Sequence, residues 1–118
     1  MYEAATRNLR TAERFLIEPP LSGQFLGSAA LVIDISVKGA RFRHAHPLEM
    51  GQKGVLQMTI DGRPSPAFLE AVVVWTKPDP FAPGRYVSGV RTYADAELID
   101  PLLAHLQTAK RTTRIAEL

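Results

Sequence analysis

The eleven residues VIDISVKGARF, at positions 32–42, predict two strands joined by a tight turn. Apolar, β-branched and aromatic residues fill both ends of this stretch, as is typical of strands. In its middle, Asp34 and Ser36 are residue types that bond to nearby backbone in turns, and Gly39 suits a sharp change of direction. The two strands that we expect here are Ala29–Ile35 and Ala40–His44, with the turn at Val37–Gly39.

On both sides of this hairpin, short apolar runs alternate with turns. Nine prolines and eight glycines punctuate the chain. The further strands that we expect are one within Phe15–Gly27 that Pro19-Pro20 interrupts, then Gly54–Ile60, Ala67–Thr76 and Arg85–Tyr93. Short strands at this spacing favour an antiparallel barrel or sandwich.

The spacing of apolar residues changes near the C-terminus, where a helix is expected. The residues that recur at helical spacing are Leu98, Ile99, Leu102, Leu103 and Leu106. Asp100-Pro101 is typical of an N-cap followed by a first-turn proline. Such a helix would cover an open end of a barrel with its leucine face.

Length and composition limit the class of protein. A chain of 118 residues is the size of one domain. We divide it into an N-terminal arm (1–14), a barrel with its C-terminal helix (15–110) and a tail (111–118). The absence of cysteine excludes disulfides, thiolate zinc sites and cysteine nucleophiles. Neither a secretory signal nor a run of about 18 apolar residues is present, so we expect a cytoplasmic protein without membrane insertion.

The charge balance favours a small anionic ligand over duplex nucleic acid. The formal net charge is only +2, yet ten of the fourteen cationic residues are arginines. Guanidinium groups suit phosphates and planar bases better than lysine does.

Two short motifs stand out, and each is weak alone. Arg10 and Arg14 form an R-x-x-x-R, and Arg7 would share their face if the segment were helical, as on many solvated helices. Twenty residues after Arg14, Asp34 opens a D-x-S-x-x-G. Together, in this order and among strands, the two motifs make the chain resemble the PilZ domain family over about residues 7–107.

The resemblance extends to two other segments. Positions 32–42 look like the family's core hairpin, and Val73-Val74-Trp75 with 86–91 look like its closing strands. It implies a mainly β protein, a six-stranded antiparallel PilZ-type β-barrel with a C-terminal helix packed on one end. It also implies a non-enzymatic receptor for cyclic di-GMP, with no cofactor, no metal and no catalytic residues.

By this resemblance, the ligand-binding residues are Arg10, Arg14, Asp34, Ser36 and Gly39. The two arginines would meet guanine O6 and N7 and a phosphodiester, in an order that the sequence leaves open. Asp34 would accept the guanine N1–H and N2–H groups, Ser36 would offer a hydroxyl, and Gly39 would let the ligand approach the backbone. Arg7 and Lys38 are auxiliary candidates.

The resemblance also implies a switching mechanism. Ligand would order the arginine arm over the barrel and so present a new surface to an effector protein, which the sequence does not identify. Leu9 precedes the first arginine of the motif, where family members that hold a stacked ligand dimer tend to carry another arginine. Leu9 therefore favours one ligand per chain, although the nearby Arg7 weakens that argument.

Alternative functions remain open. One is an interaction module of the same fold that binds no nucleotide. Another is a single-stranded nucleic-acid binder, which would need several aromatics on one exposed face. Trp75 is expected in the barrel core or as a lid for the helix. Arg41 and Arg43 are expected on a solvated exterior face, where they could also add positive potential near the ligand.

Catalytic and metal sites are weaker alternatives. His44 and His46 form an H-x-H that would face one side of a strand, but two exposed histidines in a turn are the simpler interpretation. A Ser36-His44-Asp34 hydrolase would need an oxyanion motif, which is missing from the sequence.

Overall fold

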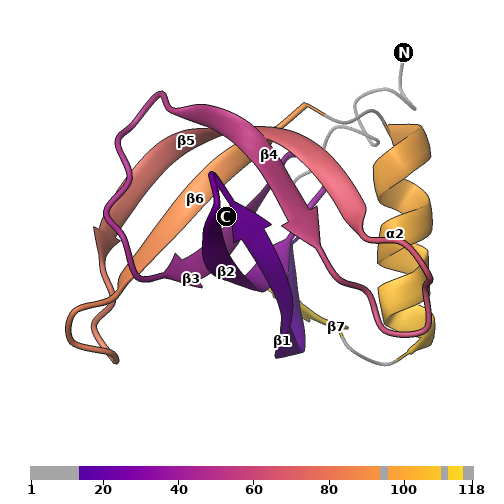
Figure 1. Ribbon diagram of the computed structural model, residues 1–118. Coiled ribbons are helices and arrows are strands. Elements are labelled where there is room, and N and C mark those ends of the chain that lie inside the picture. Colours follow the sequence, from indigo (N-terminus) through magenta and orange to yellow (C-terminus); the bar gives the residue numbers. More distant parts are fainter. Residues whose placement is uncertain (1–13, 94–95, 110–111, 116–118) are drawn as a thin grey trace, which may run out of the picture.

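The computed structural model describes residues 14–93, 96–109 and 112–115 of the chain, with the side chains of 14–93 and 101–109 (Figure 1). Seven strands and one helix make up this part. They are β1 (Arg14–Phe25), β2 (Ser28–Ile35), β3 (Gly39–His44), β4 (Lys53–Met58), β5 (Ala67–Pro78), β6 (Tyr86–Thr92), α2 (Ala96–Thr108) and β7 (Thr112–Ile115).

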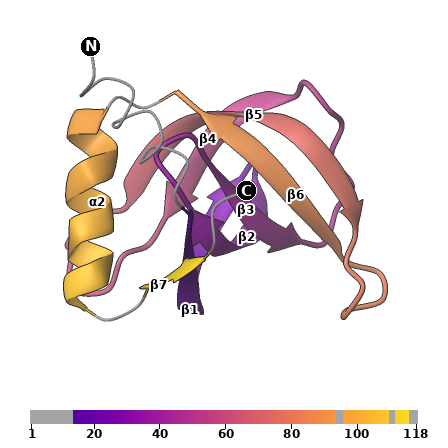
Figure 2. The same ribbon diagram turned by 180° about the vertical axis from the view of Figure 1, so that it is seen from behind.

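Six of the strands form a closed antiparallel ring. The strand order is β2-β3-β6-β5-β4-β1-β7, and an additional pairing of β1 with β2 closes the ring. The same arrangement is visible from behind in Figure 2, where β5 and β6 cross over the hairpin of β2 and β3. The predicted antiparallel barrel is therefore confirmed.

One core fills the ring and continues under the helix. Alternate residues of the strands point inward, because successive side chains of a strand lie on opposite faces. The largest fully buried side chains include Phe25, Phe42, Leu56, Met58, Leu102 and Leu106. Since α2 contributes Leu102, Leu103 and Leu106 to this core, the helix covers one end of the barrel, as its leucine spacing predicts (Figure 1).

The start of α2 differs from the sequence prediction. Asp100-Pro101 was expected to begin the helix, but α2 begins at Ala96 and contains Pro101. A proline inside a helix removes one backbone hydrogen bond. Burial of the three leucines that follow offsets this loss, so packing determines where the helix lies.

Strand β1 lies where the sequence predicts a strand that Pro19-Pro20 interrupts. The strand continues through the two prolines, and the interruption is a shift in its register with β2 between Leu16 and Leu21. Proline lacks the N–H that a ladder needs, so an irregular pairing at this point is the expected consequence.

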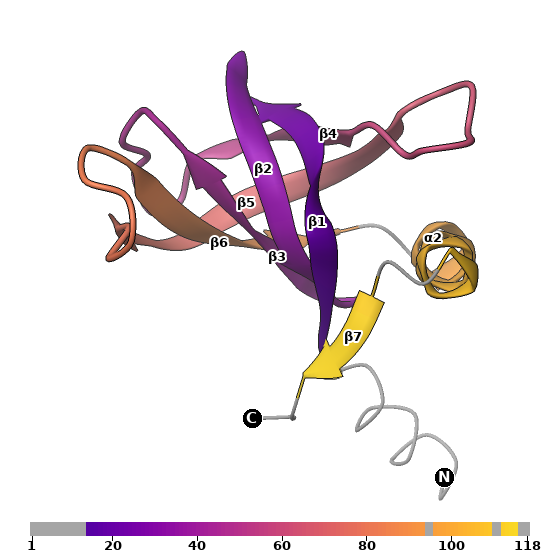
Figure 3. The same ribbon diagram turned by 90° about the horizontal axis from the view of Figure 1, so that it is seen from below.

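A short strand follows the helix where the sequence predicted only a tail. Strand β7 pairs with the first residues of β1, with Arg14 opposite Ile115 and Ile17 opposite Thr112. Figure 3 shows β7 at the outer end of β1, beyond the ring. The start of β1 is therefore held from both sides, by β2 and by β7, which fixes the backbone that carries Arg14.

Candidate functional site

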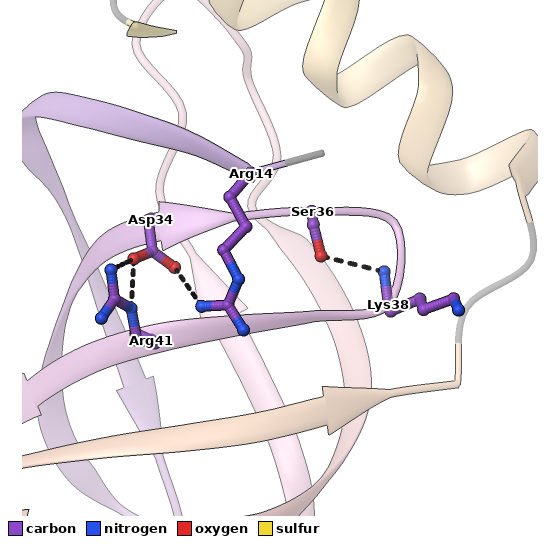
Figure 4. A network of polar contacts seen from close by, with 5 residues as sticks. All are labelled: Arg14, Asp34, Ser36, Lys38 and Arg41. Atoms are coloured by element: carbon purple, nitrogen blue, oxygen red, sulfur yellow. Dashed lines mark hydrogen bonds and ion pairs between the residues drawn. The ribbon is translucent and has the colours of Figure 1, made fainter. Parts of the chain in front are cut away.

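Asp34 and Arg41 form the centre of the site, on the hairpin of β2 and β3. They are directly opposite each other in the register, after a shift at Ile33. The Arg41 Nε and Nη2 groups both contact Asp34 Oδ2 (Figure 4). The irregularity at Ile33 allows Val32 and Ile35 to face the core while Asp34 lies on the other face, beside Arg41.

Arg14 approaches the same carboxylate from β1. Its Nη1 lies 3.7 Å from Asp34 Oδ1, which makes an ion pair rather than a hydrogen bond. Asp34 is 1% exposed, whereas the side chains of Arg14 and Arg41 are 36% and 34% exposed. The surface of this cluster therefore consists of guanidinium groups, with the carboxylate beneath them.

The turn after Asp34 is held by its own backbone and by Ser36. The Ser36 N–H donates to the Gly39 carbonyl (2.8 Å), and the Lys38 N–H donates to Ser36 Oγ (3.2 Å). Ser36 is buried and Lys38 is exposed. In Figure 4 the Ser36 hydroxyl points to the Lys38 backbone nitrogen, and the Lys38 side chain points away from it. Ser36 therefore stabilises the turn, as its residue type predicts, and keeps a hydroxyl proton to donate.

Gly39 is required for close packing rather than for an unusual φ. It is not one of the glycines with positive φ. A Cβ at this position would lie 2.2 Å from the Val90 carbonyl oxygen on β6. Gly39 thus brings the hairpin against β6, where the Thr92 N–H donates to the Lys38 carbonyl at 2.9 Å.

Trp75 does not lie in the core, so that prediction is wrong. Gly89 is opposite Arg41 on β3 and opposite Trp75 on β5, which puts all three on the outer face. A Cβ on Gly89 would lie 2.3 Å from the indole Nε1, so the half-buried ring lies across this glycine. Lys77 Nζ lies 5.2 Å from the ring centroid. A shift in register after Val73 turns Trp75 outward.

Arg43 is ion-paired, not simply solvated as the sequence suggested. Its Nε lies 3.5 Å from Oδ2 of the buried Asp79, whose other oxygen accepts the Phe81 N–H. This pair anchors the loop between β5 and β6 and leaves Arg41 as the β3 arginine in contact with Asp34.

His44 is buried, contrary to the expectation of two exposed histidines. Its Nδ1 lies 2.7 Å from the His46 carbonyl, so Nδ1 carries the proton, and its Nε2 lies 2.6 Å from Ser88 Oγ, which also bonds to Thr76 Oγ1 at 2.9 Å. Burial lowers the pKa of His44, an effect that the bond to His46 opposes and the nearby positive charges of His46 and Arg85 reinforce. His44 therefore bonds to Ser88 inside the barrel. It is not positioned to act with Ser36 as a hydrolase, and it does not form a metal-binding pair with the exposed His46.

The structure brings part of the predicted site together. Asp34, Ser36, Lys38 and Gly39 lie along one hairpin end, and Arg14 reaches Asp34 from β1. Arg7 and Arg10, like the rest of the predicted arm before Arg14, lie outside the described residues. Across the part of the chain whose side chains are described, no His, Asp or Glu cluster is arranged to hold a metal.

Arg41 is the member of the cluster that was not among the predicted site residues, and its contact with Asp34 was not predicted. A signal was present, because Arg41 stands two residues after Gly39 and so lies opposite Asp34 once the hairpin closes. Counted outward from the turn, Ile35 pairs with Ala40 and Asp34 with Arg41, and the irregularity at Ile33 comes only beyond this pair.

These features define a small antiparallel barrel with arginine side chains gathered on the outer face of one hairpin. The model of the PilZ domain matches residues 8–107. The chain belongs to the PilZ domain family. Comparisons with curated proteins and with solved structures gave no significant match. No helix within the described residues is long and apolar enough to span a bilayer.

Proposed function

We propose that this PilZ domain is a cytoplasmic, non-enzymatic receptor for cyclic di-GMP that signals through contact with an effector protein. The observation that carries the proposal is the cluster of Arg14, Asp34 and Arg41, in which two guanidinium groups share one buried carboxylate. Two positive charges and one negative charge leave this cluster a net +1. A monoanionic phosphodiester is a matching partner for such a group.

The surroundings of the cluster suit a purine nucleotide. Trp75 presents an indole two strands away from Arg41, across the side-chain-free Gly89. Aromatic faces accept stacked bases, and an arginine fork meets the O6 and N7 acceptors of guanine. The combination of guanidinium groups with an aromatic face supports a guanine nucleotide over a simple inorganic anion.

The arginines before β1 complete the proposed site. Arg14 is the first residue of β1, so Arg10 and Arg7 precede it within a few residues of the cluster. In the proposed mechanism the ligand orders the residues before Arg14 over the outer face, with Lys38 as a further cation. Ordering costs conformational entropy, which the new ionic contacts must outweigh.

Trp75 offers a direct test, because it is the only tryptophan in the chain. We expect cyclic di-GMP, added to the full chain, to change the fluorescence of Trp75 in a saturable way, while GTP at equal concentration does not. Trp75→Phe removes the signal and serves as the blank. Unchanged fluorescence, together with an unchanged melting temperature at high ligand concentration, would contradict the proposal.

A second candidate is an interaction module of the same fold that binds no nucleotide. Its support is a shallow groove on the outer face of β1, β4 and β5, which is lined by Gln24, Leu26, Gly27, Val55, Gln57 and Phe68. Leu26, Val55 and Phe68 are exposed large apolar residues, of a kind that gathers at protein–protein contacts. The same titration separates the two candidates, since this module predicts no response to cyclic di-GMP.

A further inference from the structure

We propose that Asp34 is a positioning residue that acts through Arg14 and Arg41, and that Arg41 itself contacts the ligand. This inference rests on the proposed function and assigns roles within that same site. It replaces the expectation that Asp34 accepts the guanine N1–H and N2–H groups directly. It also adds to the site a residue outside the R-x-x-x-R and D-x-S-x-x-G motifs.

The first argument is access to the carboxylate. Asp34 is 1% exposed, and each of its oxygens faces a guanidinium group, Oδ2 that of Arg41 and Oδ1 that of Arg14. A guanine that contacted Asp34 directly would have to displace Arg41 from Oδ2 or Arg14 from Oδ1, and expose a buried charge. Contact with the partly exposed arginines requires neither change (Figure 4).

The second argument is the way in which Arg41 is held. A guanidinium has five N–H donors, and Arg41 directs its Nε and Nη2 groups at Asp34 Oδ2, which leaves donors for a ligand. Its backbone lies between β2 and β6, opposite Asp34 and Gly89. A side chain fixed in this way loses little further freedom on binding, which favours affinity.

The third argument is the difference between the two arginines. Arg14 Nη1 is 3.7 Å from Asp34 Oδ1, too far for a hydrogen bond, so Arg14 keeps its donors for other partners. Arg41 is the fixed guanidinium and Arg14 the adaptable one. Asp34 keeps both close together, and their mutual repulsion is reduced by the carboxylate between them.

The first test compares two ligands by calorimetry on the full chain. The probes are cyclic di-GMP and its inosine analogue, which keeps O6 and N7 but lacks the 2-amino group. We expect Asp34→Asn to weaken both ligands by the same factor, about tenfold, the size of one charge-assisted hydrogen bond. A loss confined to cyclic di-GMP would overturn the inference, because it would show that Asp34 contacts the 2-amino group.

The second test is a double-mutant cycle between Asp34→Asn and Arg41→Met. If Asp34 acts largely through Arg41, Asp34→Asn lowers the affinity for cyclic di-GMP about tenfold in the wild-type background. When Arg41 is already Met, the same substitution lowers it about threefold or less. Equal factors in both backgrounds would overturn the inference. Arg41→Lys should recover part of the affinity that Arg41→Met loses, since lysine keeps the charge without the fork.

A charge-matched control separates a local effect from a general one. Arg63 is exposed in the turn between β4 and β5, so Arg63→Met removes one positive charge away from the hairpin. We expect Arg63→Met to bind cyclic di-GMP with the affinity of the wild type, while Arg41→Met binds it at least about tenfold more weakly. Melting curves of each variant without ligand establish that it is folded.

The outcomes distinguish the two levels of the proposal. If the wild-type chain binds cyclic di-GMP and Arg41→Met, folded, binds equally well, the inference fails and the proposed function stands. If the wild-type chain itself does not bind, the proposed function fails and takes the inference with it.

Discussion

Asp34 on β2 and Arg41 on β3 are opposite each other across the hairpin, and the Arg41 guanidinium directs two of its donors at one oxygen of the Asp34 carboxylate. The Asp34 side chain is 1% exposed and the Arg41 side chain is 34% exposed. The two partners therefore depend on the contact to different degrees. A guanidinium released from it can be hydrated, whereas the carboxylate cannot without a change in structure.

This asymmetry predicts the stability of variants. Arg41→Met should lower the free energy of unfolding by about 1–3 kcal/mol, because among the described residues it leaves the buried carboxylate with the more distant Arg14 as its cationic partner. Asp34→Ala should cost less, and adding it to Arg41→Met should recover stability. Urea unfolding of the three variants measures this, and a larger loss for Asp34→Ala than for Arg41→Met would contradict the account.

A methyl group at Gly39 should separate the hairpin from β6. The new Cβ of Gly39→Ala would lie 2.2 Å from the Val90 carbonyl oxygen. We expect a loss of about 1–3 kcal/mol, as for other overpacked sites, with faster exchange of the Thr92 amide. Hydrogen exchange and urea unfolding test this together.

Gly62→Ala provides the matched control for that experiment. Gly62 has a φ of 81° and open space around it, so a methyl group strains only its own turn. The control should lose stability while the Thr92 amide keeps its protection. Normal protection of Thr92 in Gly39→Ala would argue against the close packing described above.

His44 should make the barrel less stable in mild acid. Its pKa is lowered from the ordinary value of 6.5 mainly by burial, so the unfolded chain binds a proton at a pH where the folded chain does not. The stabilisation is complete above about 6.5 and decreases as the pH falls towards the lowered folded pKa. Urea unfolding at pH 7.5 and 5.5 measures this difference.

His44→Gln is the variant to compare. Glutamine can still donate to the His46 carbonyl and hydrogen-bond the Ser88 hydroxyl, but it does not titrate. We expect it to be less stable at pH 7.5, since it loses the ring contacts of His44 with Phe42 and Tyr86, and less sensitive to acid. An equal loss on acidification in both chains would exclude His44 as the cause.

Much of the fold could be predicted because local patterns and the core agree. The turn after Asp34, the strand periods and the leucines of α2 each indicate the element that forms. Positions where one residue interrupts a pattern could not be predicted in the same way. The start of α2 relative to Pro101 and the outward turn of Trp75 depend on packing and on a register shift, which a single sequence does not reveal.

The candidate site was predictable to a similar extent. Motif spacing selected Asp34, Ser36 and Gly39, and the structure shows a physical role for each in the hairpin. Arg41 was not selected, because its importance comes from its cross-strand pairing with Asp34, which the two motifs do not include. Arg10 stays a prediction from the sequence.

The most direct test of the central claim is calorimetric titration of the full chain with cyclic di-GMP, with GTP as the control. We expect selective, saturable binding of one ligand per chain, and a loss of about 1–3 kcal/mol of binding free energy in Arg14→Ala and in Arg10→Ala, the range for bidentate arginine contacts. Two ligands per chain would contradict the argument from Leu9. No binding of cyclic di-GMP by the folded wild-type chain would contradict the receptor itself and leave the interaction module as the function to test.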